Sequence, residues 1–270
     1  MDQEESTDRR IELNGRNPGV DELAWLGQVN YGHFTTMQVR DGWVRGFELH
    51  LQRLAHATRI LFDRTLDVDQ VRAWARGIVA DRSVSLRITV FSMAFDQGRG
   101  EHASAVDVLM ATRAPRLPRA ATLRLRSVRH ERVLPQIKHI GMFDLLYHAR
   151  AARVAGYDDV LLTTNDGEIA EGSTWNIGFW DGQQVIWPTA PALPGITQKL
   201  LNSGLRANGV ETMSRPVHLH SLAGIRSAFI LNSGSLGPMI ESIDSQRLAA
   251  DADLPRILAA AHDSQSLEKI

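Results

Sequence analysis

The stretch that decides how this chain is interpreted is Ile169-Ala170-Glu171-Gly172-Ser173-Thr174-Trp175-Asn176. In it a carboxylate stands between an apolar strand and a polar turn. Burial of that charge would have to be offset by a cationic partner. A plain glutamate exposed to solvent at the end of a strand is the alternative. The meaning of Glu171 therefore depends on the chemistry that the rest of the chain offers.

Lysine is rare among the basic residues of this chain, and one lysine has unusual neighbours. Only three of the 30 lysines and arginines are lysines, and one of them, Lys138, lies mid-chain among apolar neighbours. Arginine replaces lysine in most ion pairs, but it stays protonated and cannot act as an amine nucleophile. An apolar surrounding also makes the neutral amine more accessible. Lys138 is thus a candidate nucleophile. The alternative is that this lysine has no chemical role and is one of three by chance.

Three further features are suited to binding a phosphate group. Gly195-Ile196-Thr197 opens a predicted helix, and the first N–H groups of a helix bind anions. Asn232-Ser233-Gly234-Ser235 follows a buried strand and offers hydroxyl and main-chain donors. Arg53 lies on a predicted amphipathic helix and has the planar donor geometry that phosphate requires. With Lys138, these features indicate a ligand that carries both a phosphate and a reactive aldehyde. A carboxylate such as Glu171 would then keep a protonated pyridine ring nitrogen charged.

The pattern of apolar residues predicts an α+β fold with two lobes. Strands and helices alternate without regular βαβ order, which argues against a doubly wound sheet. Two prolines in Arg113-Ala114-Pro115-Arg116-Leu117-Pro118-Arg119 break both periodicities and indicate an interdomain linker. We therefore predict an N-terminal lobe over 1–112, a linker over 113–119 and a C-terminal lobe over 120–270 that carries Lys138. We expect strands at 10–14, 85–91, 105–111, 122–126, 157–164, 175–180, 184–187 and 229–231, a hairpin over 32–48, and helices at 49–61, 68–80, 142–155, 195–208 and 254–262.

Composition excludes several other classes of function. A net charge of -1 gives no positive field for nucleic acid, and the absence of cysteine excludes disulfides and thiolate metal sites. His218-Leu219-His220 lacks a third ligand at a suitable spacing, so no metal site is expected. The first ten residues lack the apolar run of a secretory signal, and no stretch is long and apolar enough to span a membrane. We expect a cytoplasmic protein that binds neither membranes nor nucleic acid.

These features together resemble the signature of the class IV (fold type IV) aminotransferases, which use pyridoxal 5′-phosphate. The order and spacing agree over some sixty residues and extend to most of the chain. The matching segments are Asn30–Thr36, Phe47–Leu54, Lys138, Ala152–Leu162, Asp166-Gly167, Ala170–Ser173, Asn176-Ile177, Trp187-Pro188, Leu193–Thr197 and Phe229–Pro238.

The resemblance implies a role for each matching residue. Lys138 corresponds to the lysine that forms the Schiff base and moves the proton between substrate Cα and cofactor C4′. Glu171 corresponds to the partner of the pyridine nitrogen. Arg53, Ile196, Thr197 and Ser233 correspond to the phosphate site. The family is typically a homodimer, and its substrates are an amino donor and a 2-oxo acid. Tyr31, His33, Thr35 and Gly234 are candidates for the substrate pocket, with packing as the alternative for the first two.

Departures from the subfamily patterns leave the reaction open. Phe34-Thr35-Thr36 and Ile137-Lys138-His139 are most similar to 4-amino-4-deoxychorismate lyase, which releases pyruvate, but Gly141-Met142 replaces the polar pair expected there. The Arg-Gly loop expected after the strand at 85–91 is also missing. The tyrosine of the branched-chain enzymes and the Arg and His pair of the D-amino-acid enzymes are not visible. Transamination is the leading hypothesis, the lyase is the second, and a cofactor-binding protein without catalysis is the third.

Overall fold

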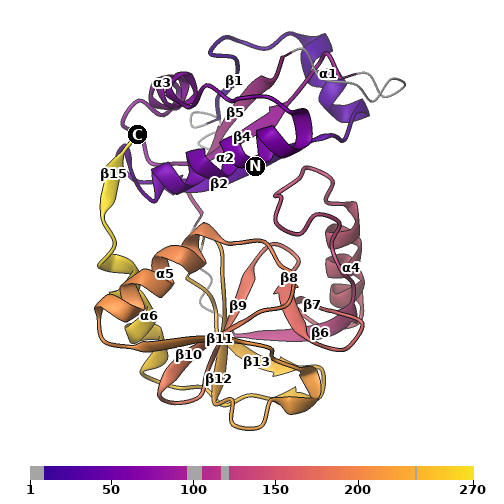
Figure 1. Cartoon of the computed structure of the whole chain (residues 1–270), viewed down its shortest axis with the longest axis vertical. Coiled ribbons are helices and arrows are strands. Elements are labelled where there is room, and N and C mark those ends of the chain that lie inside the picture. Colours follow the sequence, from indigo (N-terminus) through magenta and orange to yellow (C-terminus); the bar gives the residue numbers. More distant parts are fainter. Residues whose placement is uncertain (1–8, 96–104, 117–121, 235) are drawn as a thin grey trace. The chain divides into compact units, whose positions relative to one another are not determined.

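The chain forms two compact units in a computed structural model that describes residues 9–95, 105–116, 122–234 and 236–270 (Figure 1). The first unit comprises Met1–Arg116, Ile137–Gly141 and Leu267–Ile270. The second comprises Leu117–Gln136 and Met142–Ser266. None of the helices in the described ranges has the length and hydropathy needed to cross a membrane.

The first unit is built on an antiparallel four-stranded sheet in the order β1-β5-β4-β2. Two helices, α2 and α3, pack against this sheet, and the short strands β3 and β15 pair with each other. The elements are β1 Ile11–Leu13, α1 Val20–Gln28, β2 Gly32–Val39, β3 Trp43–Arg45, α2 Phe47–Phe62, α3 Val68–Val79, β4 Val84–Phe91, β5 Asp107–Arg113 and β15 Leu267–Lys269.

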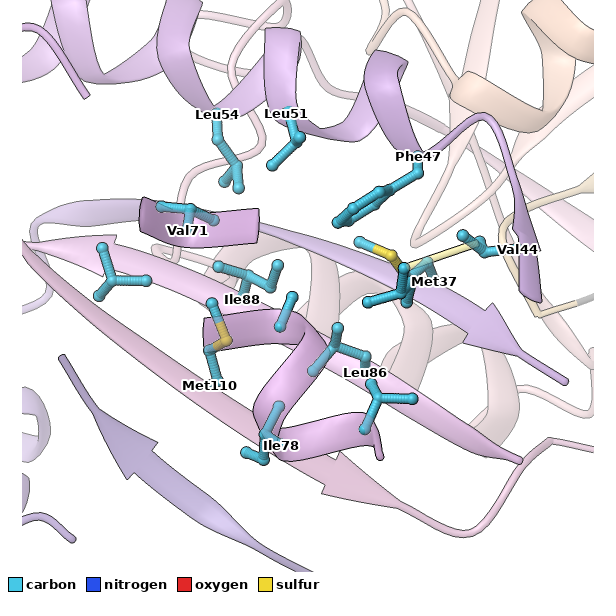
Figure 2. Close-up of a cluster of buried hydrophobic side chains, with 14 of the residues drawn as sticks. Met37, Val44, Phe47, Leu51, Leu54, Val71, Ile78, Leu86, Ile88 and Met110 are labelled. Atoms are coloured by element: carbon cyan, nitrogen blue, oxygen red, sulfur yellow. The ribbon is translucent and has the colours of Figure 1, made fainter. Parts of the chain in front are cut away.

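The core of this unit forms because the helices and the sheet each have one apolar face. Figure 2 shows Phe47, Leu51 and Leu54 of α2 directed towards Met37 and Ile88 of the sheet. All five side chains are almost wholly buried. Phe47, Leu51 and Leu54 recur at helical spacing, while the residues that β2 and β4 contribute to this core stand at alternate positions along each strand. The buried apolar residues of α2 therefore form the face that fixes this helix on the sheet.

The segment Ile137–Gly141 joins the first unit by extending its sheet at β2. Phe34 N donates to Lys138 O at 2.8 Å, Ile140 N donates to Gly32 O at 2.9 Å, and a bridge links His33 to His139. The predicted C-terminal lobe includes Lys138, whereas these hydrogen bonds attach Lys138 to the N-terminal sheet. The reason is that the edge of β2 offers main-chain donors and acceptors that local periodicity does not reveal.

The second unit contains two sheets and three α-helices. A five-stranded sheet has the order β14-β13-β6-β7-β8, and a four-stranded sheet has the order β11-β10-β9-β12. Helix α4 packs on β7 and β6, and α5 packs against α6. The elements are β6 Leu123–Arg129, α4 Phe143–Val154, β7 Asp159–Thr163, β8 Ile169–Gly172, β9 Asn176–Trp180, β10 Gln184–Pro188, α5 Ile196–Ala207, β11 Glu211–Arg215, η2 Leu219–Ser221, β12 Ser227–Leu231, β13 Ile240–Ile243, β14 Gln246–Arg247 and α6 Leu254–Asp263.

Most predicted elements are present within a few residues, but the predicted hairpin over 32–48 is reduced to two strands and the turn between them. A single bridge joins Arg40 to Trp43, after which β2 pairs with β4 and β3 pairs with β15. The ladder cannot extend because α2 begins at Phe47, soon after the turn. The predicted linker over 113–119 overlaps β5 at Arg113, and its last three residues lie outside the described ranges.

Candidate functional site

Lys138 projects from the strand that extends the first sheet. Its Nζ lies 4.9 Å from the centre of the Phe34 ring, and the Arg87 guanidinium lies 3.7 Å from the same ring centre. Both cations are partly buried, and the aromatic ring stabilises each electrostatically. The other two lysines differ, since Lys199 is exposed and Lys269 pairs with Asp81 at the surface. Lys138 is therefore the one lysine whose surroundings limit its hydration.

Arg53 of α2 is held by two buried polar residues, Thr35 of β2 and His50 of α2. It donates through Nη2 to Thr35 Oγ1, and Thr35 Oγ1 lies 2.6 Å from His50 Nδ1. Because the hydroxyl oxygen accepts from Arg53, its proton is available for His50 Nδ1. Burial, with Arg53 and Lys138 nearby, lowers the pKa of His50 well below its usual value. A neutral histidine thus accepts the hydroxyl proton and fixes the guanidinium.

The charge of Arg53 has no carboxylate partner among the described residues. Burial lowers its pKa to about 10, and its Nε is buried without a hydrogen-bond partner there. A cation held in place and left uncompensated is suited to binding an anion, because a bound anion offsets the cost of desolvation. This observation fits the predicted role of Arg53 at a phosphate group.

Glu171 is buried in the second unit with only 5% of its surface exposed. Its Oε1 accepts from Arg132 Nη1 at 3.0 Å and from Leu193 N at 3.2 Å. Arg132 also donates to Pro135 O at 3.0 Å. The cationic partner that a buried Glu171 needs is Arg132, a residue that the sequence pattern does not indicate. No local pattern identifies it, because the two residues are 39 positions apart and meet only through the fold.

The segment Leu193–Thr197 leads from the Glu171 contact into α5. Asn176 Nδ2 donates to Leu193 O at 2.8 Å. Helix α5 begins at Ile196 without a side-chain cap, and Ile196 and Thr197 are both buried. Its first N–H groups have no intrahelical acceptor, so this end can bind an anion. The helix start predicted from Gly195-Ile196-Thr197 is present, and its role in binding a phosphate stays a prediction.

The turn after β12 is held by Asn232. Gly234 N donates to Asn232 Oδ1 at 2.8 Å, and Asn232 Nδ2 donates to Thr174 O at 3.3 Å. Ser233 and Gly234 are partly buried, while Ser235 lies outside the described residues. The turn is thus tied to the loop that follows Glu171, and both predicted phosphate-binding segments of the second unit contact the same stretch of chain.

Tyr31 and His33, two of the predicted substrate residues, are engaged within the first unit. The Tyr31 hydroxyl donates to Leu61 O at 2.8 Å, and its ring stacks on Phe95. His33 is buried, and its Nε2 bonds to Thr58 Oγ1 at 3.0 Å. These contacts support the packing alternative for both residues. Thr35 is wholly buried beneath Arg53, so its contact is with the guanidinium.

Comparison with known families assigns the chain. The family model for amino-transferase class IV matches residues 32–243, which is well over half of the sequence. The chain belongs to the class IV aminotransferase family. The matched range includes Arg53, Lys138, Glu171, Ile196, Thr197 and Ser233. The family predicted from the sequence is therefore confirmed.

Individual relatives of this class IV aminotransferase support the same fold. The bifunctional aminodeoxychorismate lyase / D-amino acid transaminase of Mycobacterium tuberculosis is 24% identical over 243 residues, covering 80% of this chain and 83% of the relative. The structure of the Escherichia coli branched-chain amino acid aminotransferase matches with a TM-score of 0.83 and 19% identity over 96% of this chain and 95% of the other. A PLP-bound aminotransferase from Mycobacterium tuberculosis matches with a TM-score of 0.76 and 19% identity over 93% and 96%.

These comparisons confirm the predicted α+β, fold type IV architecture and an enzyme of the aminotransferase class, with the lyase as a plausible alternative. The family implies pyridoxal 5′-phosphate as cofactor. The side chains fit such a group in kind. The chain supplies an uncompensated buried cation, an uncapped helix start and a buried carboxylate.

Proposed function

We propose that the protein is a transaminase that holds pyridoxal 5′-phosphate on Lys138 and transfers an amino group between an amino acid or amine and a 2-oxo acid. Membership of the family and the environment of Lys138 support this proposal. Of the three lysines, this one alone is partly buried and faces an aromatic ring. A partly buried lysine is a candidate for the Schiff base, because a side-chain amine is the nucleophile that condenses with an aldehyde.

Each proposed site residue has one task. When bound, the cofactor supplies an electron sink for the carbon from which the substrate proton is removed. Lys138 would hold the aldehyde of the cofactor, and its Nζ would then take the proton from the substrate Cα and return it during the transfer. Glu171, which accepts a hydrogen bond from Arg132, would pair with the ring nitrogen. The phosphate would be held by Arg53, by the N–H groups of Ile196 and Thr197, and by Ser233.

Trapping of Lys138 tests this proposal directly. Borohydride reduction of cofactor-saturated protein, followed by peptide mapping, should place the reduced adduct on Lys138. Both Lys138→Ala and Lys138→Arg should lose the adduct and the visible absorption, because arginine retains charge but not nucleophilicity. Lys199→Ala is the matched control, since Lys199 is exposed, and it should retain both. An adduct on another lysine would contradict the proposal.

Addition of amino donors then separates catalysis from cofactor binding alone. A transaminase should convert the bound cofactor to its amino form when a donor is added, and a 2-oxo acid should reverse the change. An adduct on Lys138 without conversion by a broad panel of donors would favour the third hypothesis, a binding protein without catalysis.

A second candidate function is 4-amino-4-deoxychorismate lyase. Phe34-Thr35-Thr36 and Lys138-His139 favour it, and the Mycobacterium tuberculosis relative is named for both activities. A coupled assay for pyruvate and 4-aminobenzoate decides between the two. Formation of both products without an added 2-oxo acid would establish the lyase.

Arg87 supports a substrate that carries a carboxylate. Its guanidinium lies over the same ring as Lys138 Nζ, and among the described residues it has no carboxylate partner. Burial and nearby Arg113 lower its pKa to about 10, so it remains a cation at neutral pH. Arg87→Met should reduce kcat/KM for a carboxylate substrate by roughly 10-fold or more, given the strength of charge-assisted hydrogen bonds. An equal loss with an amine that lacks a carboxylate would argue against this role.

We also propose a homodimer. Helix α4 exposes Phe143, Leu146, Tyr147 and Val154, with 80%, 58%, 59% and 74% of their surfaces accessible. Their spacing places Phe143, Leu146 and Tyr147 on one face of the helix. An apolar face of this kind is typical of an interface. Light scattering should give a dimer for the wild type and a smaller species for Phe143→Asp/Tyr147→Asp, and an unchanged mass would exclude this face.

A further inference from the structure

The six residues Glu171–Asn176 contact both segments that we propose bind the phosphate. Glu171 Oε1 accepts from Leu193 N, and Asn176 Nδ2 donates to Leu193 O, at 3.2 and 2.8 Å. Thr174 O accepts from Asn232 Nδ2. The carboxylate proposed for the ring nitrogen and the two phosphate-binding segments therefore share one short stretch, which we call the anchor segment.

The anchor segment is itself held firmly. Asp159 is buried and accepts at 3.0 Å from both Ser173 Oγ and Trp175 Nε1. Gly172 N donates to Trp175 O, which closes the turn. Asn176 pairs with Leu231 in the β9 and β12 ladder. The side chain of Asn176 therefore starts from a fixed point, and its contacts determine where Leu193–Gly195 lies.

Gly195 packs directly on the Asn176 side chain. A Cβ added at Gly195 would lie 2.0 Å from Asn176 Oδ1, far inside van der Waals contact. The next residue that it would meet is Gln198, whose Cβ would be 3.5 Å away, an ordinary contact. Gly195 has φ -64° and ψ 134°, a conformation open to any residue. Glycine is thus required here by the amide of Asn176 and not by the backbone.

We propose that Asn176 is a positioning residue that fixes the start of α5 relative to the Glu171 carboxylate. A ligand that binds both the start of α5 and the Glu171 carboxylate must have its phosphate and its ring nitrogen at a matching distance from each other. The inference rests on the proposed function, because the phosphate is that of the proposed cofactor. It assigns to Asn176 a selectivity for the phosphorylated aldehyde over the same aldehyde without phosphate.

Equilibrium binding of two aldehydes to the apoprotein tests this role. Fluorescence quenching gives the Kd of pyridoxal 5′-phosphate and of pyridoxal, which lacks the phosphate. Asn176→Ala should weaken binding of the phosphorylated form by about 10-fold, the value of one charge-assisted or buried hydrogen bond, and alter the Kd of pyridoxal by less than about 2-fold. Asn176→Asp, which keeps the shape but lacks the donor, should act in the same direction.

Coupling with Gly195 gives a second, independent readout. Gly195→Ala alone should weaken binding of the phosphorylated form at least as much as Asn176→Ala. In the Asn176→Ala background the same change should cost less than about 3-fold, because the obstructing oxygen is gone. Asn202→Ala is the matched control. Asn202 lies on α5 and accepts one hydrogen bond from Trp187 Nε1, so the control should retain the ratio of the two Kd values.

Two results would overturn the role of Asn176 and leave the proposed function standing. The first is an equal loss of affinity for both aldehydes in Asn176→Ala and Asn176→Asp. The second is full additivity of the Asn176 and Gly195 substitutions. Circular dichroism at each step establishes that the variants are folded. If the folded wild type formed no adduct on Lys138 and bound neither aldehyde, the proposed function would fail and this inference with it.

Discussion

The two units treat buried charge in opposite ways. In the first, Arg53 and Arg87 are partly buried cations, and neither has a carboxylate partner among the described residues. In the second, Glu171 is buried against Arg132, and the side chains of both are less than a tenth exposed. The first unit therefore carries a charge that a ligand must balance, whereas the second balances its own.

This difference indicates how each unit prepares for the cofactor. The Arg132–Glu171 pair and the anchor segment are complete without a ligand, so they hold a fixed framework. Arg53 is oriented by Thr35 and His50, but its charge is only compensated when an anion binds. Binding of an anion should therefore stabilise the first unit, whereas the buried charges of the second unit are already balanced without a ligand.

Removal of Glu171 should have the largest effect. Glu171→Ala takes the carboxylate away from the buried guanidinium of Arg132, and breaking a buried pair in this way costs about 3–5 kcal/mol. Glu171→Leu/Arg132→Met should recover most of the loss, because both charges are then gone. Urea unfolding measures the free energy of each variant. If Glu171→Ala lowered the free energy of unfolding no more than the double substitution, Glu171 would not be the group that balances the charge of Arg132.

Replacement of Thr35 should disrupt the support of Arg53. Thr35→Val keeps the shape but removes the hydroxyl that joins Arg53 to His50, and a buried hydrogen-bonding group left unsatisfied costs about 1–3 kcal/mol. Thr35→Ser retains the hydroxyl and serves as the control. Unfolding of the two variants should differ by this amount. Equal stability would mean that packing alone orients the guanidinium.

Acid should weaken the first unit in a defined range. Burial and nearby Arg53 lower the pKa of His33 to about 3, from an ordinary value of 6.5. The unfolded chain therefore binds a proton more readily than the folded one. The contribution of His33 to stability is complete above pH 6.5 and should be lost as the pH falls from 6.5 towards 3, with a slope of at most about 1.4 kcal/mol per pH unit. His50 acts in the same direction. His33→Gln should flatten this slope in urea titrations, whereas His56→Gln, at an exposed position, should not.

Replacement of Arg53 should have the smallest effect on the unliganded protein. Arg53→Met removes an uncompensated cation, so the free energy of unfolding should change by less than about 1 kcal/mol. Inorganic phosphate should raise the Tm of the wild type but not that of Arg53→Met. Arg59→Met, at an exposed position on the same helix, should behave like the wild type. If Arg53→Met lost much stability in the absence of phosphate, Arg53 would not be an uncompensated cation, and the two units would not differ in how they balance buried charge.

Local sequence was sufficient where neighbouring residues define the feature. The stripe of α2, the uncapped start of α5 and the spacing around Lys138 and Glu171 depend on residues a few positions apart. Helical and strand periodicity report directly on such features. The family and the proposed site residues could therefore be predicted without coordinates.

The partners of those residues required the tertiary structure. Arg132 reaches Glu171 across 39 positions, and Arg53 meets Thr35 across 18. The assignment of Lys138 to the C-terminal lobe failed for the same reason, since its strand pairs with β2, about a hundred residues earlier in the chain. Hydrogen bonds and ion pairs depend on distance in space. Local sequence therefore indicates the candidate groups for the chemistry, whereas the groups that hold them in place depend on the fold.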